Sequence, residues 1–148
     1  MKHLLLTTIA AVVLVGCGPS MSLREAVEKG DIDVVKQHIS NGVDVNIISD
    51  SVLNYTALHS ASSLLNVEVV ELLLASGANV NAKDMAGRTP LDLVQGPTYV
   101  NQLLPSANDI ESHINNMLEI DMKTKMNKIG SLLRKHGGKT GEELEAGN

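Results

Sequence analysis

Residues 68–81 read EVVELLLASGANVN, and this stretch decides the fold. The valines and leucines at 69–74 give a wide apolar face to a short helix. Gly77 follows that face and predicts the end of the helix, because glycine adopts the left-handed conformation without steric cost. Beyond the glycine, Val80-Asn81 predicts the base of a short, β-like finger that turns outward.

The same pattern occurs elsewhere in the chain, so an internal repeat sets the architecture. At an offset of 35, residues 26–35 align with 61–70 and residues 42–46 with 77–81. At an offset of 33, TALH at 56–59 aligns with TPLD at 89–92. Self-similarity at this period is typical of stacked repeat arrays. One helix pair cannot bury its apolar face alone, so we expect the stability to come from stacking.

These residues resemble ankyrin repeats, whose pattern runs T-P-L-H, then E-V-V-E-L-L-L, then G-A-D-V-N. The resemblance covers about residues 22–94 and resumes at about 128–138. It implies an all-α stack of about three helix-turn-helix repeats in a domain at 22–138. Leu65 stands where the family places a glycine in the turn between two helices. We therefore expect that turn to be wide or strained.

The third repeat is split by an insertion. Gly77 and Gly137 lie 60 residues apart where 33 are expected, so about 27 residues are added, within about 95–127. Apolar residues at steps of three and four predict one helix from about Ala107 to His136. Its first half is expected to project from the stack or to fold back on residues 95–105. Residues 139–148 read as a C-terminal tail.

The N-terminus predicts export. A basic start, about a dozen apolar residues and small residues before Cys17 are typical of a signal peptide, here residues 1–16. Leu14-Val15-Gly16-Cys17 resembles a bacterial lipobox, which implies a lipidated Cys17 and a short tether at 17–21. Gly18 then favours the outer membrane, facing the periplasm, over the inner membrane. The alternative is an ordinary secretory signal with an incidental cysteine.

Composition argues against several classes of function. Cleavage before Cys17 leaves 132 residues, and the net charge of −5 becomes −6, because Lys2 is lost. An acidic domain is a poor candidate for binding nucleic acid. The sequence GKT at 138–140 lacks the earlier glycine of a phosphate loop. The histidines are scattered, and His59 fits a structural role in the T-P-L-H motif. We therefore expect no cofactor, no metal site and no catalysis.

The first candidate interaction surface is the concave side that ankyrin-like stacks use, formed by the fingertips and by exposed positions on the first helix of each repeat. The first finger has several apolar residues and no glycine, and the second is more polar. The candidate contact residues for another protein are Ile47, Ile48, Val52, Leu53 and Tyr55 in the first finger, with Met85 and Arg88 in the second. Exposed apolar clusters often mark contact sites. The alternative is that the aliphatic side chains of the first finger pack onto the stack or the insertion.

The leading hypothesis is a monomeric protein-binding module, lipid-anchored in the bacterial cell envelope. A second hypothesis is a structural protein that self-associates through the inserted helix, whose Met117, Met122 and Met126 adapt to irregular partners. A stripe at helical spacing is, however, more often part of a core. A third hypothesis is an unrecognised hydrolase or a binder of small molecules.

Overall fold

The computed structural model describes residues 21–48, 53–95 and 109–147, without the side chains of 109–117. The helices are α1 (Leu23–Lys29), α2 (Ile32–Ser40), α3 (Ala57–Ser63), α4 (Val67–Ala75), α5 (Pro90–Gln95), α7 (Asp109–Lys135) and α8 (Gly141–Glu145). In these parts of the chain there is no β-strand. The predicted β-like fingers are therefore built from turns.

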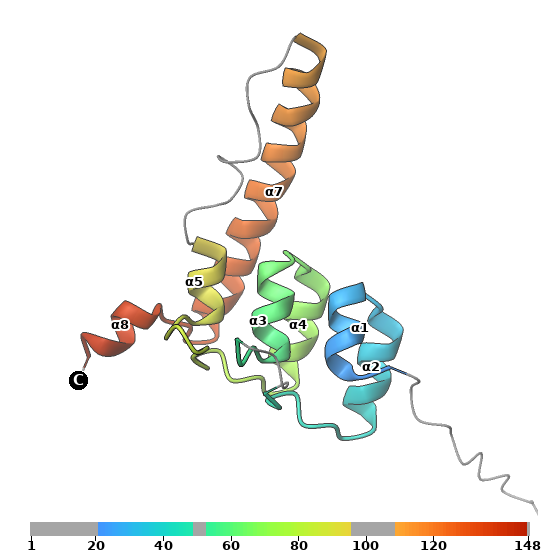
Figure 1. The fold of residues 1–148 in the computed structure, drawn as a ribbon, viewed down its shortest axis with the longest axis vertical. Helices are drawn as coiled ribbons and strands as arrows, with labels where there is room; N and C mark the ends of the chain where they lie inside the picture. Colours follow the sequence, from blue (N-terminus) through green and yellow to red (C-terminus); the bar gives the residue numbers. More distant parts are fainter. Residues whose placement is uncertain (1–20, 49–52, 96–108, 148) are drawn as a thin grey trace, which may run out of the picture.

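The helices form two rows (Figure 1). One row is α1, α3 and α5, and the other is α2, α4 and α7, with contacts between neighbours in each row and between the rows. Each repeat contributes one helix to each row, which confirms the predicted stack. The finger loops after α2 and after α4 lie at the same end of the helices. The short turn between α3 and α4 lies at the opposite end.

Polar caps define where the first four helices begin. Ser22 and Thr56 accept hydrogen bonds from the backbone N–H three residues later, and Asp31 and Asn66 do the same at the start of α2 and α4. Each such cap contributes about 1 kcal/mol, because it satisfies an N–H that the helix leaves without a partner.

The turn between the two helices of a repeat requires a left-handed residue. Gly30 takes this conformation in the first repeat, with φ of 67°. In the second repeat Leu65 occupies the equivalent position with φ of 55°, which an L side chain adopts only with strain. The strain expected in the turn at Leu65 is thus confirmed.

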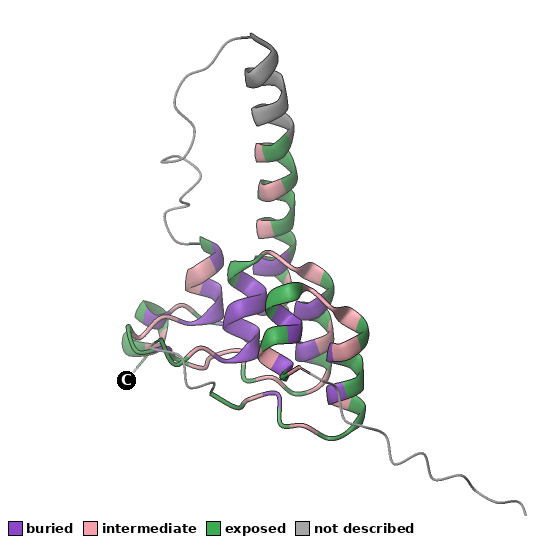
Figure 2. Ribbon diagram, turned by 45° about the vertical axis from the view of Figure 1, so that its right-hand side comes forward, coloured by how far each residue is buried: buried purple, intermediate pink, exposed green. Residues whose placement is uncertain are grey.

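The core is aliphatic, as a chain without Trp or Phe requires. Its fully buried side chains include Leu58, Leu73 and Leu91, and Figure 2 shows the buried residues gathered between the two rows. Ile129 and Leu133 of α7 are also completely buried. The end of α7 therefore supplies the second helix of the third repeat, as predicted.

Two asparagines fix each repeat to the next. Asn46 donates to Gly77 O at 3.2 Å and accepts from Asn79 N at 2.7 Å. Asn81 repeats this pattern with Gly137 O at 3.1 Å and Lys139 N at 2.8 Å. Because both asparagines make the same pair of bonds, the chain resumes the repeat in register after the insertion.

Helix α7 matches the predicted helix within two residues at its start and one at its end. It continues through Gly130 without interruption. Its first half projects past the ends of α3, α4 and α5, away from the fingers (Figure 1). Of the two expected arrangements of this half, the structure has the projecting one. Met122 is partly exposed, while Met126 packs against the core and Met117 lies outside the described side chains.

The predicted C-terminal tail at 139–148 needs a correction, because it contains α8. Thr140 and Glu143 form a capping box at the start of this helix. Gly141 N donates to Asp92 at 2.7 Å, and Thr89 donates to Lys139 O at 2.8 Å. These bonds attach the start of α8 to the start of α5, and a Cβ at Gly141 would clash with the carbonyl of Gly87.

Candidate interaction surface

The apolar residues of the first finger are exposed. Ile47 is 58% exposed, Ile48 is 55% and Leu53 is 46%, whereas Val52 lies outside the described residues. The expectation that these side chains pack onto the stack or the insertion is therefore not met for the three that are described. Met85 at the tip of the second finger is 69% exposed. Its backbone N–H donates to Leu53 O at 3.2 Å, which joins the two fingers.

Tyr55 and Arg88 take part in a network that connects the fingers to the stack. Arg88 Nε donates to Asp84 Oδ2 at 2.9 Å, and another guanidinium N–H donates to Tyr55 Oη at 3.0 Å. The Tyr55 ring stacks on the ring of His59, with centroids 5.3 Å apart. Both residues are partly buried, and they hold the fingers in place. The exposed side chains of the fingers, Ile47, Ile48, Leu53 and Met85, are called the exposed cluster.

His59 has the structural role expected of it. Its Nε2 donates to Arg88 O at 3.2 Å, and its Nδ1 accepts from Thr56 N at 3.2 Å. Burial lowers the pKa of His59, and the hydrogen bond to the Arg88 carbonyl opposes part of that shift. A neutral ring with both nitrogens engaged has no free position for a metal or a substrate.

Asp84 is the buried charge beneath the second finger. Burial by itself raises the pKa of its carboxyl group. The hydrogen bonds from Arg88 and from Ala86 N outweigh that effect, so the pKa lies below its usual value. The ionised carboxylate accepts from Ala86 N, Arg88 N and the Arg88 guanidinium, which makes the second finger a rigid turn.

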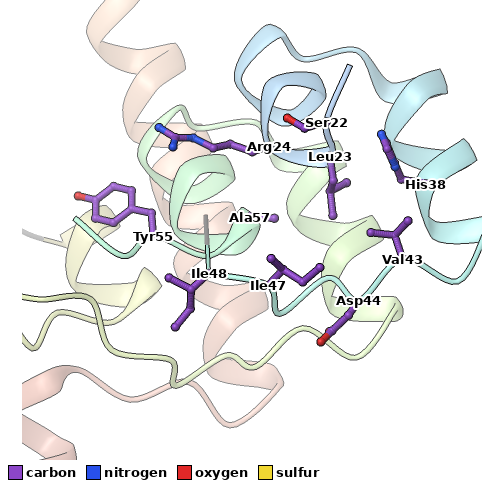
Figure 3. A pocket seen from close by; sticks show the side chains of 10 residues that line it. All are labelled: Ser22, Leu23, Arg24, His38, Val43, Asp44, Ile47, Ile48, Tyr55 and Ala57. Carbon is purple, nitrogen blue, oxygen red and sulfur yellow. The ribbon is translucent and has the colours of Figure 1, made fainter. Parts of the chain in front are cut away.

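A pocket of about 420 Å³ lies beside the exposed cluster. Its lining comes from the start of α1, the end of α2, the first finger and the start of α3, namely Ser22, Leu23, Arg24, His38, Val43, Asp44, Ile47, Ile48, Tyr55 and Ala57. In Figure 3, Ile47 and Ile48 lie between Tyr55 on one side and Leu23 with Val43 on the other. Of the predicted contact residues, the structure thus brings Ile47, Ile48 and Tyr55 to one cavity.

Comparison with known proteins agrees with this architecture. The family model described as "Ankyrin repeats (3 copies)" matches residues 23–116, more than half of the chain. The chain belongs to the ankyrin-repeat family. Ankyrin repeats typically bind other proteins.

Similar ankyrin-repeat sequences occur within larger proteins. The chain is 39% identical over 69 residues to a 2-5A-dependent ribonuclease of Mus musculus, covering 47% of this chain and 9% of that protein. It is 39% identical over 70 residues to the potassium channel AKT1 of Arabidopsis thaliana, covering 47% and 8%. With an ankyrin repeat-containing protein of Schizosaccharomyces pombe it shares 29% identity over 90 residues, covering 61% and 39%. The chain therefore spans less than half the length of each of these relatives.

The described part of the ankyrin-repeat chain shows neither a metal site nor a membrane-spanning helix. Among the residues that the structure describes, no group of three or more His, Cys, Asp or Glu side chains is arranged to hold a metal ion. Within the same residues, no helix combines the length and the apolar character needed to span a bilayer. The predicted signal peptide, Cys17 and Gly18 lie outside the described residues.

Proposed function

We propose that this ankyrin-repeat chain is a lipid-anchored binding protein of the bacterial cell envelope, which holds another protein at its fingers. The observation that carries the proposal is the exposed cluster of Ile47, Ile48, Leu53 and Met85 on the two fingers. Apolar side chains gathered on a surface favour association, because contact with a partner removes them from water.

The contacts that hold the described parts of the two fingers support a binding role. Asn46 and Asn81 hold the finger bases, the bond from Met85 N to Leu53 O joins the fingers, and Asp84 with Arg88 fixes the second turn. A surface that is already ordered loses little conformational entropy when it binds. Affinity can then come from a small number of apolar contacts.

The membrane attachment depends on Cys17. A single acyl chain holds a protein only weakly, whereas two or more hold it firmly. A lipidated Cys17 would therefore keep the stack at the bilayer without a membrane-spanning helix, and Gly18 favours the periplasmic face of the outer membrane. Radiolabelled palmitate should enter the wild-type protein and not the Cys17→Ser variant. Equal labelling of the two would refute the anchor.

Capture of partners from envelope extracts tests the binding role. The double variant Ile48→Asp, Leu53→Asp should retain little of the captured protein, because both changes put charges into the cluster while circular dichroism stays helical. Leu64→Asp is the matched control, since Leu64 is also exposed but lies in the turn between α3 and α4, at the other end of the helices from the fingers. Equal capture by wild type and the double variant would remove the fingers from the proposal.

Self-association through α7 is the second candidate. Leu118 and Ile120 are exposed on the projecting half of this helix. A second copy of the chain could bury them, which would give the protein a structural role. Light scattering of the Cys17→Ser protein should then show a dimer or larger species that disappears on deletion of residues 97–125. A monomer at all concentrations would exclude this candidate.

We also propose that the chain acts without catalysis and without a cofactor. The pocket beside the first finger has one histidine, His38, in its lining, and within the described residues its ring contacts the carbonyl of Met21 and no carboxylate. The lining is mainly aliphatic and suits binding better than acid–base chemistry. Turnover of a generic ester or peptide substrate, lost in His38→Gln, would overturn this view.

A further inference from the structure

The pocket beside the first finger has an apolar floor and a size suited to side chains. Leu23, Val43, Ile47, Ile48 and Ala57 supply aliphatic atoms from three separate segments. The volume of about 420 Å³ lies in the range of small-ligand sites. It is too small for a folded element, but it can receive a large apolar side chain from an extended segment.

Asp44 gives this pocket a negative charge that no ion pair within the described residues balances. Two ionised side chains line it, Arg24 and Asp44. The Arg24 guanidinium is bonded to Glu28 at 2.6 Å, so its charge is already balanced. Asp44 is exposed and accepts a hydrogen bond from Asn46 N at 2.9 Å, and within the described residues it has no ion pair. An occupant with a positive charge next to its apolar group would complement Asp44.

His38 adds a separate indication of what the pocket takes. The residue is only 9% exposed, and its Nε2 lies 2.8 Å from Met21 O, to which it can only donate. When Nε2 carries the proton of the uncharged ring, Nδ1 is an acceptor, and within the described residues it has no hydrogen-bond partner. A buried acceptor without a donor costs about 1–3 kcal/mol. Because His38 lines the pocket, an occupant that carries an N–H group can supply the missing donor.

We infer that this pocket binds an extended segment of the partner protein in which a large apolar side chain stands next to a lysine or arginine. The inference rests on the proposed binding function and specifies its partner. The apolar side chain fills the space between Leu23, Val43 and Ile47, and the cation pairs with Asp44. A lipid acyl chain would match the apolar floor, but it offers neither a cation nor an N–H donor.

A random heptapeptide display library, selected on the intact purified protein, tests this assignment. The selected peptides should share an apolar residue beside Lys or Arg. Synthetic copies should bind at least tenfold more weakly when the apolar residue becomes Ala or the basic residue becomes Glu, as measured by calorimetry. A library that yields no binder, or binders without this pair, would overturn the inference.

Two variants of the protein sharpen the test. Asp44→Lys should reverse the charge preference, so that the Glu form of the peptide binds better than the Lys form. Ile47→Asp should abolish peptide binding, while Leu64→Asp, remote from the pocket, should leave it unchanged. An unreversed preference in Asp44→Lys would refute the ion pair. A lipid that copurifies with the wild type and is absent from Ile47→Asp would assign the pocket to an acyl chain instead.

The failure of this inference is distinguishable from failure of the proposed function. If peptides do not bind but the fingers still capture a protein from envelope extracts, the function stands and the pocket assignment falls. If the wild-type protein also captures no protein from envelope extracts, both the pocket assignment and the proposed function are refuted.

Discussion

The second and third repeats reach the same packing from different lengths of chain. Helices α3 and α4 are joined by residues 64–66, whereas α5 and the buried end of α7 are separated by the whole insertion. Leu58 of α3 and Leu91 of α5 are nevertheless both completely buried. The entropy cost of closing a flexible loop grows only slowly with its length, so the apolar stripe and the asparagine contacts decide where the second helix docks.

The two repeats also differ in the last residue of the four-residue motif that begins their first helix, which is TALH at 56–59 and TPLD at 89–92. His59 makes hydrogen bonds with both ring nitrogens: Nδ1 accepts from Thr56 N, and Nε2 donates to Arg88 O in the next finger. Asp92 is shorter, and its Oδ2 accepts from Thr89 and from Gly141 N at the start of α8. The equivalent position thus joins the second repeat to the following finger and the third repeat to the terminal helix.

Core truncation should give the largest difference between the two repeats. Leu58→Ala and Leu91→Ala each remove a fully buried side chain and should cost about 2–5 kcal/mol of unfolding free energy. The cost should be higher for Leu58, because α3 packs between α1 and α5, whereas α5 has a row neighbour on one side only. Urea unfolding followed by circular dichroism measures both. A larger loss at Leu91 would mean that the third repeat carries more of the stability than the second.

Removing the asparagine contacts between repeats should give the second largest loss of stability. Asn46→Ala and Asn81→Ala each remove two hydrogen bonds, for an expected loss of about 1–2 kcal/mol apiece. Hydrogen exchange should become faster at Asn79 N in the first variant and at Lys139 N in the second. If Asn81→Ala costs far less than Asn46→Ala, the split repeat is docked more loosely than the structure indicates.

Lowering the pH should reduce the stability of the second repeat, by less than the substitutions above. The pKa of His59 is lower in the folded protein than in the unfolded chain, so the unfolded state binds more protons below about pH 6.5. The contribution of neutral His59 to the free energy of unfolding is therefore fully present above that pH. It decreases as the pH falls toward the pKa of His59 in the folded protein. His59→Gln should flatten the dependence of melting temperature on pH between 7 and 5. The third repeat has Asp92 at this position and lacks this histidine.

Removing the insertion should have the smallest effect on the stack. In a variant with residues 97–126 replaced by a copy of the turn at 64–66, with Gly in place of Leu65, the free energy of unfolding should change by less than about 1 kcal/mol. The reason is that the buried residues Ile129 and Leu133 and the Asn81 contacts remain. Loss of cooperative unfolding in this variant would show that the projecting half of α7 supports the third repeat.

The sequence predicted most of the fold because periodicity and glycine positions are local signals. The inserted helix, the split repeat and the strained turn at Leu65 all follow from spacing along the chain. Helix α8 was missed, since its five residues have no apolar period. It depends on remote contacts with Asp92 and on the bidentate pairing of Arg134 with Glu143, which lowers the pKa of Glu143 to about 2. The Thr140–Glu143 spacing was the one local sign of it.

The candidate surface was harder to predict. The exposure of Ile47, Ile48 and Leu53 was one of two open alternatives, because composition does not say whether an aliphatic loop packs or stays in water. Tyr55 and Arg88 proved to be partners of His59 and Asp84, contacts that join residues far apart in the sequence. The pocket was not predicted at all, since its lining comes from segments that meet only after the stack has formed.

The position of the insertion, between α5 and α7, has a practical consequence. Helix α5 ends at Gln95, at the end of the stack away from the fingers, and the first half of α7 projects beyond that same end (Figure 1). A fluorescent reporter or a catalytic domain grafted into the insertion would sit clear of the surface that meets other molecules. Such a scaffold can carry cargo at one end and remain available for docking at the other.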